Sequence, residues 1–265
     1  MQRMVLRGMM VTACALANSA LAQTYPSKPI RFLVGFPPGG GADTVARLLA
    51  KHLTDAWGAT FVIENRPGAD STIATELGAK AAPDGHTLIT VTNAHVITPF
   101  QRKLPYDPVK DFAPVTLAAT GPNFLLVHPA MPVKNLKELI ALAKARPDTM
   151  SFGSSGTGTS PYLAMELLKS MAGVKMVHVP YKGTGIAVVD LIAGNIQLMF
   201  GAIATTIPFI KAGRLKALAV SSSKPIAAAP DVPPVANTLP GFEADRKSTR
   251  LNSSHVSESR MPSSA

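Results

Sequence analysis

The fold of this chain follows from one stretch, Ser151-Phe-Gly-Ser-Ser-Gly-Thr-Gly-Thr-Ser160, which leads directly into Pro161-Tyr-Leu-Ala-Met-Glu-Leu-Leu168. Its ten positions hold six hydroxyl residues and three glycines. Glycines allow the tight turns that aim successive backbone N–H groups at one point. We expect Ser160 to cap an amphipathic helix with Pro161 at its first position. A helix N-terminus among hydroxyl groups favours an anion, and because the stretch has no lysine we predict a small carboxylate rather than a polyphosphate. A flexible loop without a ligand is the alternative.

A second glycine-rich stretch, Gly35-Phe-Pro-Pro-Gly-Gly-Gly-Ala-Asp43, favours the ligand site. It follows the β-rich run 30–34 and precedes apolar residues at helical spacing over 43–53. Strand, glycine loop and helix open an α/β unit, and such folds bind ligands at the carboxyl ends of their strands. Two nucleotide motifs fail here: a Walker loop needs lysine where Gly41 stands, and a dinucleotide fingerprint needs glycine where Thr44 stands.

The rest of the chain alternates between predicted strands and helices. Strands are predicted at 60–64, 86–92, 124–128, 175–179, 194–200 and 215–220, and helices at 72–81, 135–145 and 186–193. A proline-rich connection over 105–114 is typical of a passage between lobes. The pattern predicts an α/β protein with two lobes, a central ligand cleft and a hinge on which the lobes close.

The first 22 residues are predicted to be a signal peptide. Arg3 and Arg7 precede an apolar run that ends in Ala20-Leu-Ala22, so we expect cleavage after Ala22 and export across a bacterial inner membrane. Val11-Thr-Ala-Cys14 also fits a lipoprotein box loosely, which would anchor the chain at Cys14 instead. The single cysteine excludes a disulfide and a cysteine-based metal cluster.

Charge and motif spacing argue against two other classes of protein. The formal net charge is +10, but the basic residues are scattered, with no run longer than Arg102-Lys103, so nucleic-acid binding is not indicated. A serine hydrolase using Ser155 would need glycine where Thr157 closes the elbow motif begun by Gly153, and none of the six histidines stands in a recognisable motif. An exported α/β hydrolase therefore remains only as an alternative.

Several short motifs occur together in the order found in one family. They are Tyr25-Pro-Ser-Lys-Pro-Ile30, the 35–43 stretch, Asn65-Arg-Pro-Gly68, Pro83-Asp-Gly85, Asp111-Phe-Ala-Pro-Val115, Tyr181-Lys-Gly183 and Leu218-Ala-Val220. Over 25–242 the chain resembles the Bug family, the extracytoplasmic receptors of tripartite tricarboxylate transporters. The resemblance implies a two-lobed periplasmic binding fold without catalysis, cofactor or metal. It further implies a small carboxylate ligand that is handed to the membrane permease subunits of such a transporter. A receptor that presents its ligand to a signalling partner would share the same cleft, so that alternative stays open.

The resemblance also implies that residues in three loops contact the ligand. In the first lobe, with ordered water bridging to the ligand, they are Pro38, Gly39, Gly40 and Asp43. In the second lobe, donating to a carboxylate, they are Ser155, Gly156, Thr157 and Thr159. Lining the cleft are Tyr181, Gly183 and Thr184, with Ala202 behind them.

One departure from the family pattern lies near the predicted cleft. After Asn65-Arg-Pro-Gly-Ala69 the family commonly has small glycines, whereas this chain has Asp70, Ser71 and, further on, Ala74. An acidic side chain in the cleft would repel a carboxylate. We therefore expect Asp70 to point into solvent, because loop carboxylates usually stay hydrated; otherwise the ligand is not a simple di-acid.

The expected domain organisation is discontinuous. Residues 23–122 and 221–244 are assigned to the first lobe and 123–220 to the second. From 245 to 265 the sequence loses both periodicity and the family pattern and resembles translated cloning sequence, so we expect a non-native, disordered tail. Members of the family continue with a strand and helices, so the first lobe is expected to be incomplete at its C-terminal end.

Overall fold

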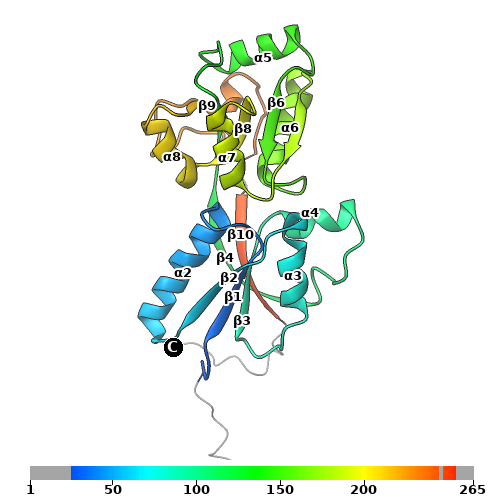
Figure 1. Ribbon diagram of the computed structural model, residues 1–265, viewed down its shortest axis with the longest axis vertical. Helices are drawn as coiled ribbons and strands as arrows, with labels where there is room; N and C mark the ends of the chain where they lie inside the picture. Colours follow the sequence, from blue (N-terminus) through cyan, green and yellow to red (C-terminus); the bar gives the residue numbers. More distant parts are fainter. Residues whose placement is uncertain (1–24, 245–246, 255–265) are drawn as a thin grey trace, which may run out of the picture.

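The structure is a computed structural model that describes residues 25–244 and 247–254. It consists of two α/β lobes stacked along the long axis of the molecule (Figure 1). Lobe 1 comprises residues 25–121 and 247–254, and lobe 2 comprises residues 123–244. Within these described residues, no helix combines the length and the apolar character that crossing a membrane requires. The two-lobed α/β architecture predicted from the sequence is confirmed.

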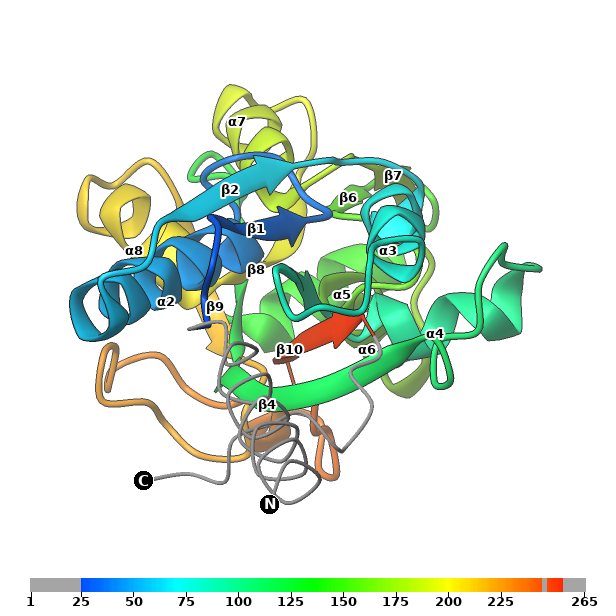
Figure 2. The same cartoon turned by 90° about the horizontal axis from the view of Figure 1, so that it is seen from below.

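Lobe 1 opens with the predicted strand, glycine loop and helix. Its elements are β1 (Ile30–Val34), α2 (Gly41–Trp57), β2 (Phe61–Asn65), the 3-10 turn η2 (Ala69–Ser71), α3 (Thr72–Ala79), β3 (Thr87–Val91), α4 (Ala94–Gln101) and β4 (Phe112–Gly121). β1 pairs in parallel with both β2 and β3. Because successive side chains of a strand face opposite sides, Phe32 packs toward the α2 side with Ala46, and Leu33 packs toward the α3 side with Ala74. The two helices therefore cover opposite faces of the sheet (Figure 2).

Lobe 2 repeats the same plan. Its elements are β5 (Asn123–Val127), α5 (Leu136–Ala145), β6 (Ser151–Ser154), α6 (Ser160–Ala172), β7 (Val177–Pro180), α7 (Thr184–Ala193), β8 (Leu198–Ala202), α8 (Ile203–Lys211), β9 (Lys216–Val220) and the 3-10 turn η3 (Val235–Asn237). β6 is parallel to β7 and β8, and β5 is antiparallel to β8 and β9. Every residue of β5 and β8 is buried, which places the sheet between two apolar layers.

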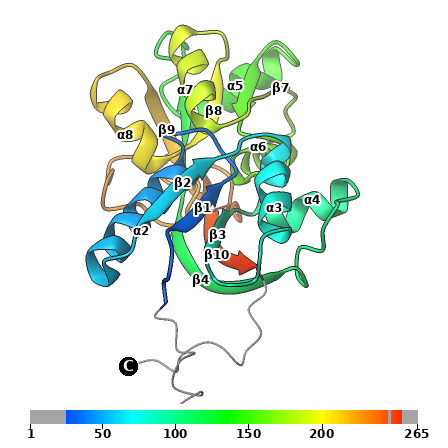
Figure 3. The same cartoon turned by 60° about the horizontal axis from the view of Figure 1, so that its bottom comes forward.

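Each sheet contains an antiparallel strand, β10 (Lys247–Ser254) in lobe 1 and β5 in lobe 2, that the chain enters directly after it passes from the other lobe. The sheet orders are β2-β1-β3-β10-β4 in lobe 1 and β7-β6-β8-β5-β9 in lobe 2. β5 enters lobe 2 directly after β4, and β10 enters lobe 1 directly after the end of lobe 2. β10 runs beside β4 (Figure 3), and the pairing begins at Lys247↔Gly121, next to the lobe junction. The two chain crossings are thus adjacent, which is the arrangement expected of a hinge.

Two expectations for the C-terminal part were wrong. The segment 221–244 packs on lobe 2 rather than lobe 1, because Val235 and Phe242 supply buried apolar area to its core and the Phe242 ring stacks 6.2 Å from that of Phe200. Residues 247–254 were expected to be disordered, yet their backbone pairs with β3 and β4. The expected signal peptide 1–22, its alternative anchor Cys14 and residues 255–265 lie outside the described residues. The non-native origin of the tail stays a prediction.

The first glycine loop is held in shape by a buried carboxylate, Asp43. It accepts hydrogen bonds from Gly39 N (2.9 Å), Arg47 Nε (2.9 Å) and Asn65 Nδ2 (2.8 Å). Asn65 Nδ2 also donates to Phe36 O at 2.9 Å, which ties the loop to the end of β2. Burial by itself raises the pKa of the Asp43 carboxyl, but the bonds from Arg47, Asn65 and Gly39 outweigh it and hold the pKa below its usual value.

These hydrogen bonds to Asp43, which we call the Asp43 clamp, predict that the free energy of unfolding depends on pH. Asp43→Asn should lower the free energy of unfolding by roughly 1–3 kcal/mol at pH 7, since the buried network loses its negative charge and one of its two acceptor oxygens. Because the folded pKa is depressed, the wild-type advantage is complete above the unfolded pKa of about 4 and disappears as the pH falls through the folded pKa. Urea denaturation at pH 7 and at pH 3 measures the difference.

The matched control is Asp55→Asn on the same helix, where Asp55 forms an exposed ion pair with Lys51. It should leave the urea midpoint unchanged. A difference between wild type and Asp43→Asn that is the same at both pH values would contradict the clamp.

Candidate functional site

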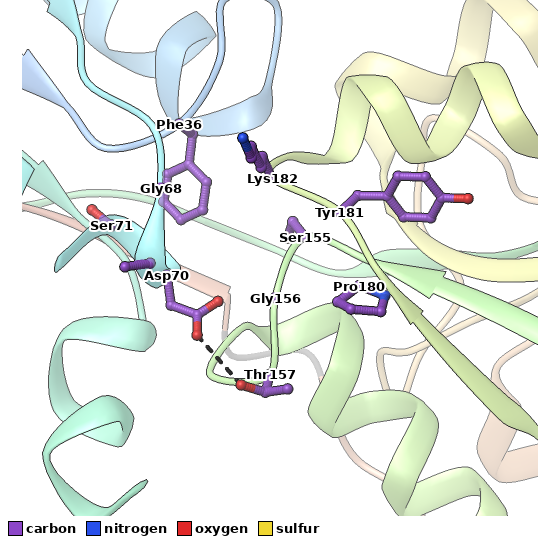
Figure 4. A pocket seen from close by; sticks show the side chains of 11 residues that line it. Phe36, Gly68, Asp70, Ser71, Ser155, Gly156, Thr157, Pro180, Tyr181 and Lys182 are labelled. Carbon is purple, nitrogen blue, oxygen red and sulfur yellow. Dashed lines mark hydrogen bonds between the residues drawn. The ribbon is translucent and has the colours of Figure 1, made fainter. Parts of the chain in front are cut away.

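Two adjoining cavities lie between the lobes and share Phe36 and Ser155 as lining residues. The larger, about 220 Å³, is bounded by Phe36 and residues 68–71 of lobe 1 and by residues 155–157 and 180–182 of lobe 2 (Figure 4). The smaller, about 30 Å³, has roughly the volume that one water molecule occupies in the liquid. Together they form a small site between the lobes, as the sequence predicted for a ligand cleft.

The smaller cavity is surrounded by three helix N-termini. It is lined by Gly40 and Gly41 at the start of α2, by Thr159 and Ser160 at the start of α6, and by Thr184 at the start of α7. The first N–H groups of a helix have no intrahelical partner, and the helix dipole places partial positive charge there. Three such ends around one small space form an environment that favours an anion.

The loop that precedes α6 is fastened by its own hydroxyl groups. The N-cap of α6 is Thr159, one residue before the predicted Ser160, because the helix already includes Ser160. Thr159 Oγ1 donates to Gly156 O at 2.7 Å, and Gly156 N donates to Ser154 Oγ at 3.2 Å. Gly156 has φ +128°, a conformation that residues with a side chain rarely adopt.

The hydrolase alternative finds no support in this loop. The histidine that reaches it is His178, whose Nε2 lies 2.8 Å from Ser154 Oγ, and Ser154 is fully buried. Burial, the largest of the effects on it, lowers the pKa of His178. Ser155, which a nucleophile elbow would expose, is 6% exposed. Among the described residues, no group of three or more His, Cys, Asp and Glu side chains could hold a metal ion.

The structure brings together most, but not all, of the predicted contacts. Those that line the cavities are Gly40, Ser155, Gly156, Thr157, Thr159, Tyr181 and Thr184. Those that line neither are Pro38, Gly39, Asp43, Gly183 and Ala202. Pro38 and Gly39 are exposed, whereas the oxygens of Asp43 are engaged by the clamp within lobe 1. The role of each residue in holding a ligand stays a prediction.

Tyr181 lines the larger cavity without directing its hydroxyl group into it. The hydroxyl donates to Asp190 Oδ2 at 2.7 Å and points away from the cavity (Figure 4). Burial first, and then the hydrogen bond and charge of Asp190, raise the pKa of Tyr181 to about 12. The phenol therefore stays protonated at neutral pH and anchors the loop to α7.

Several lining residues were missed by the sequence analysis. They are Phe36, Gly68, Ala69, Ser71, Pro180 and Lys182. Phe36 and Lys182 stand inside motifs that had been singled out, so their positions between predicted contacts were an available signal. Ser71 had been noted only as a departure from the family pattern. Its Oγ is buried and has no hydrogen-bond partner within the described part of the chain.

The expectation for Asp70 was wrong. Its side chain is only 15% exposed, and it lines the larger cavity instead of pointing into solvent. Its Oδ2 accepts a hydrogen bond of 3.3 Å from Thr157 Oγ1, so the contact joins lobe 1 to lobe 2 (Figure 4). No local pattern predicts this orientation, because it depends on the positive φ angles of residues 69–71.

The lobes touch one another around the cavities. A Cβ built on Gly183 of lobe 2 would lie 2.6 Å from Pro37 Cδ of lobe 1. Gln101 Nε2 donates to Thr157 O at 3.4 Å, and Gly158 packs against α4, where an added Cβ would lie 3.1 Å from Thr98 Oγ1. Glycines at the contact points allow this close approach, so the structure shows the lobes in contact.

Comparison with known proteins identifies the family of this chain. The model of the family described as "Tripartite tricarboxylate transporter family receptor" matches residues 45–248. Protein BugT of Bordetella pertussis is 35% identical over 232 residues, which cover 86% of this chain and 71% of BugT.

Solved structures agree with this match. Rpa4515 of R. palustris, solved with adipate, is 33% identical with a TM-score of 0.85 over 89% of this chain and 79% of that one. MatC from Rhodopseudomonas palustris, with bound malate, is 34% identical with a TM-score of 0.80 over 87% of this chain and 79% of its own. The chain therefore belongs to the tripartite tricarboxylate transporter receptors, the Bug family of periplasmic solute-binding proteins.

Proposed function

We propose that this protein captures a small carboxylate between its lobes and delivers it to the membrane subunits of a tripartite tricarboxylate-type permease. The observation that carries the proposal is the meeting of three helix N-termini, from α2 in lobe 1 and from α6 and α7 in lobe 2, at the small cavity that adjoins the 220 Å³ one. Such ends stabilise a carboxylate without needing an arginine or lysine in direct contact. The relatives solved with adipate and malate support a carboxylate ligand.

One further side chain suits an anionic ligand in the larger cavity. Lys182 brings a cationic side chain to its edge, next to Phe36 in Figure 4. The Ser71 hydroxyl faces away from this cavity and lies against the backbone of Gly35, where an added Cβ would lie 1.8 Å from Oγ.

The arrangement also explains how binding would be coupled to closure. Because the proposed donors come from both lobes, one ligand contacts lobe 1 and lobe 2 only when the lobes are together. A ligand that binds the closed form better shifts the population toward it. We further propose a periplasmic location, with export directed by residues 1–22 and cleavage after Ala22, and recognition of the closed form by the permease.

The first prediction concerns ligand binding itself. A thermal-shift screen against mono-, di- and tricarboxylates should find at least one acid that raises the melting temperature. At about one hundred times its Kd, such an acid adds roughly 2.7 kcal/mol, which for this size of protein is a shift of about 5–11 °C. Thr157→Ala should weaken the binding of that acid about tenfold, because the closed form loses the hydrogen bond from Thr157 to the Asp70 carboxylate that joins the two lobes.

Thr149→Ala, an exposed substitution elsewhere in lobe 2, is the control and should keep the full shift. The proposal fails if no acid shifts the melting temperature. It also fails if Thr157→Ala binds as tightly as the control.

The second prediction concerns closure. In Gly183→Ala the new Cβ would lie 2.6 Å from Pro37 Cδ and 2.9 Å from Pro37 Cγ, so the lobes could not approach as closely as they do. Ligand affinity measured by calorimetry should fall at least tenfold. The free energy of unfolding should hardly change, because φ 177° at this position is ordinary for alanine.

The matched control is Gly185→Ala, two residues further along, where an added Cβ has no atom within 4 Å. It should keep the wild-type affinity. Equal affinity in the two variants would show that close approach of Pro37 and Gly183 is not needed for binding.

A further inference from the structure

The segment that carries Asp70 into the cavity has an unusual backbone. Ala69, Asp70 and Ser71 have φ values of 47°, 52° and 73°, and they follow Gly68 at φ 133°. Residues with a side chain are disfavoured in this left-handed region, which glycine adopts without a steric penalty. Three of them in succession persist only because the surrounding contacts hold them, and such strain is concentrated at functional sites.

Arg102 is the main contact that fixes this conformation. Its Nη2 donates to the carbonyl oxygen of Ala69 and, at 3.0 Å, to Thr72 Oγ1. The same atom lies 3.7 Å from Asp70 Oδ2. Arg102 thus holds both the backbone and the direction of the Asp70 side chain, and its own side chain remains 42% exposed.

The carboxylate of Asp70 rests on the loop that is proposed to bind the ligand. Thr157 Oγ1 donates to Oδ2 at 3.3 Å, and a Cβ added to Gly156 would lie 1.7 Å from Oδ1, so this oxygen lies directly over the Gly156 backbone. Within the described residues, the hydrogen bond from Thr157 is the one that reaches the Asp70 carboxylate. A carboxylate can accept about four hydrogen bonds, so Asp70 keeps acceptor capacity in the cavity.

The larger cavity is therefore asymmetric in charge. In Figure 4 the Lys182 side chain lies beside Phe36 and the Asp70 carboxylate lies below it, and both residues belong to the cavity lining. A ligand carboxylate is favoured on the side of Lys182 and the helix N-termini. A second carboxylate beside Asp70 would bring two like charges together in a partly buried space, which is unfavourable. An ammonium group or another N–H donor at that end would instead be attracted.

We propose that Asp70 is a specificity-determining residue, which selects a ligand with an ammonium group or other N–H donor opposite its carboxylate and discriminates against plain dicarboxylates. This inference rests on the proposed carboxylate-binding function and narrows its ligand class to amino-carboxylates. The ligand then bridges the lobes with its carboxylate held by backbone donors and its donor group held by Asp70.

The test uses pairs of probes that differ only in one end group: succinate with 4-aminobutyrate, and adipate with 6-aminohexanoate. Calorimetry on the wild-type protein should show at least tenfold tighter binding of the amino acid in one pair or both. In Asp70→Asn and Asp70→Gly this ratio should fall at least tenfold. Asp70→Gly should also melt at or above the wild-type temperature, because glycine relieves the left-handed strain.

The matched control is Asp148→Asn. Asp148 is likewise an aspartate at positive φ (56°), but it is exposed and lines neither cavity. The ratio should stay at the wild-type value in this variant.

Three results would overturn the inference. The wild type could bind the dicarboxylate of each pair as tightly as the amino acid, which leaves the proposed function standing. Asp70→Asn could raise the affinity for both members of a pair by the same factor. Asp70 would then oppose the binding of both probes equally and would not discriminate between them. If neither the wild type nor any variant binds a member of either pair or an acid of the wider panel, the proposed function fails as well.

Discussion

The site depends on one constraint, which is that parallel strands deliver their helices' N-termini to the same edge of a sheet. In lobe 1 this edge carries the turn from β1 to α2, and in lobe 2 it carries the turns from β6 to α6 and from β7 to α7. Since the two sheets are joined with these edges facing each other, the partial positive ends of three helices meet at the cleft. An anion-binding space follows from the topology before any charged side chain is considered.

Small residues turn this topology into close contact. Gly156, Gly158 and Gly183 each stand where a Cβ would meet an atom of the other lobe within 3.1 Å or less. The strands β4 and β10 lie side by side in lobe 1, and their paired ends at Gly121 and Lys247 lie at the junction with lobe 2, so a change in backbone angles there can open the opposite side. Closure is therefore controlled by backbone fit at the glycines, while the identity of the ligand is left to the few side chains that reach the cavity.

The sequence predicted what depends on local pattern and missed what depends on contacts between distant segments. β1, α2 and the loops before α6 and α7 were predicted because apolar spacing and glycine position are local signals. Asp43 was predicted to contact the ligand, because nothing in the neighbouring sequence shows that the distant Asn65 donates a hydrogen bond to its carboxylate. The segment 221–244 was placed in the wrong lobe because a proline-rich stretch has no period, and only the burial of Val235 and Phe242 reveals the sheet that it covers.

Asp43 and Asp70 show how neighbouring donors decide the role of an acidic residue. Asp43 stands in the first turn of α2 and Asp70 in the turn η2, and each of these turns follows a strand of lobe 1. Asp43 receives three hydrogen bonds from its own lobe and is 2% exposed, so its charge is compensated before a ligand arrives. Asp70 receives its hydrogen bond from the opposite lobe, and its arginine stands 3.7 Å away. A carboxylate whose hydrogen bonds all come from its own lobe shapes a loop, whereas one that accepts a hydrogen bond across the cleft takes part in closure and, as we propose, in the choice of ligand.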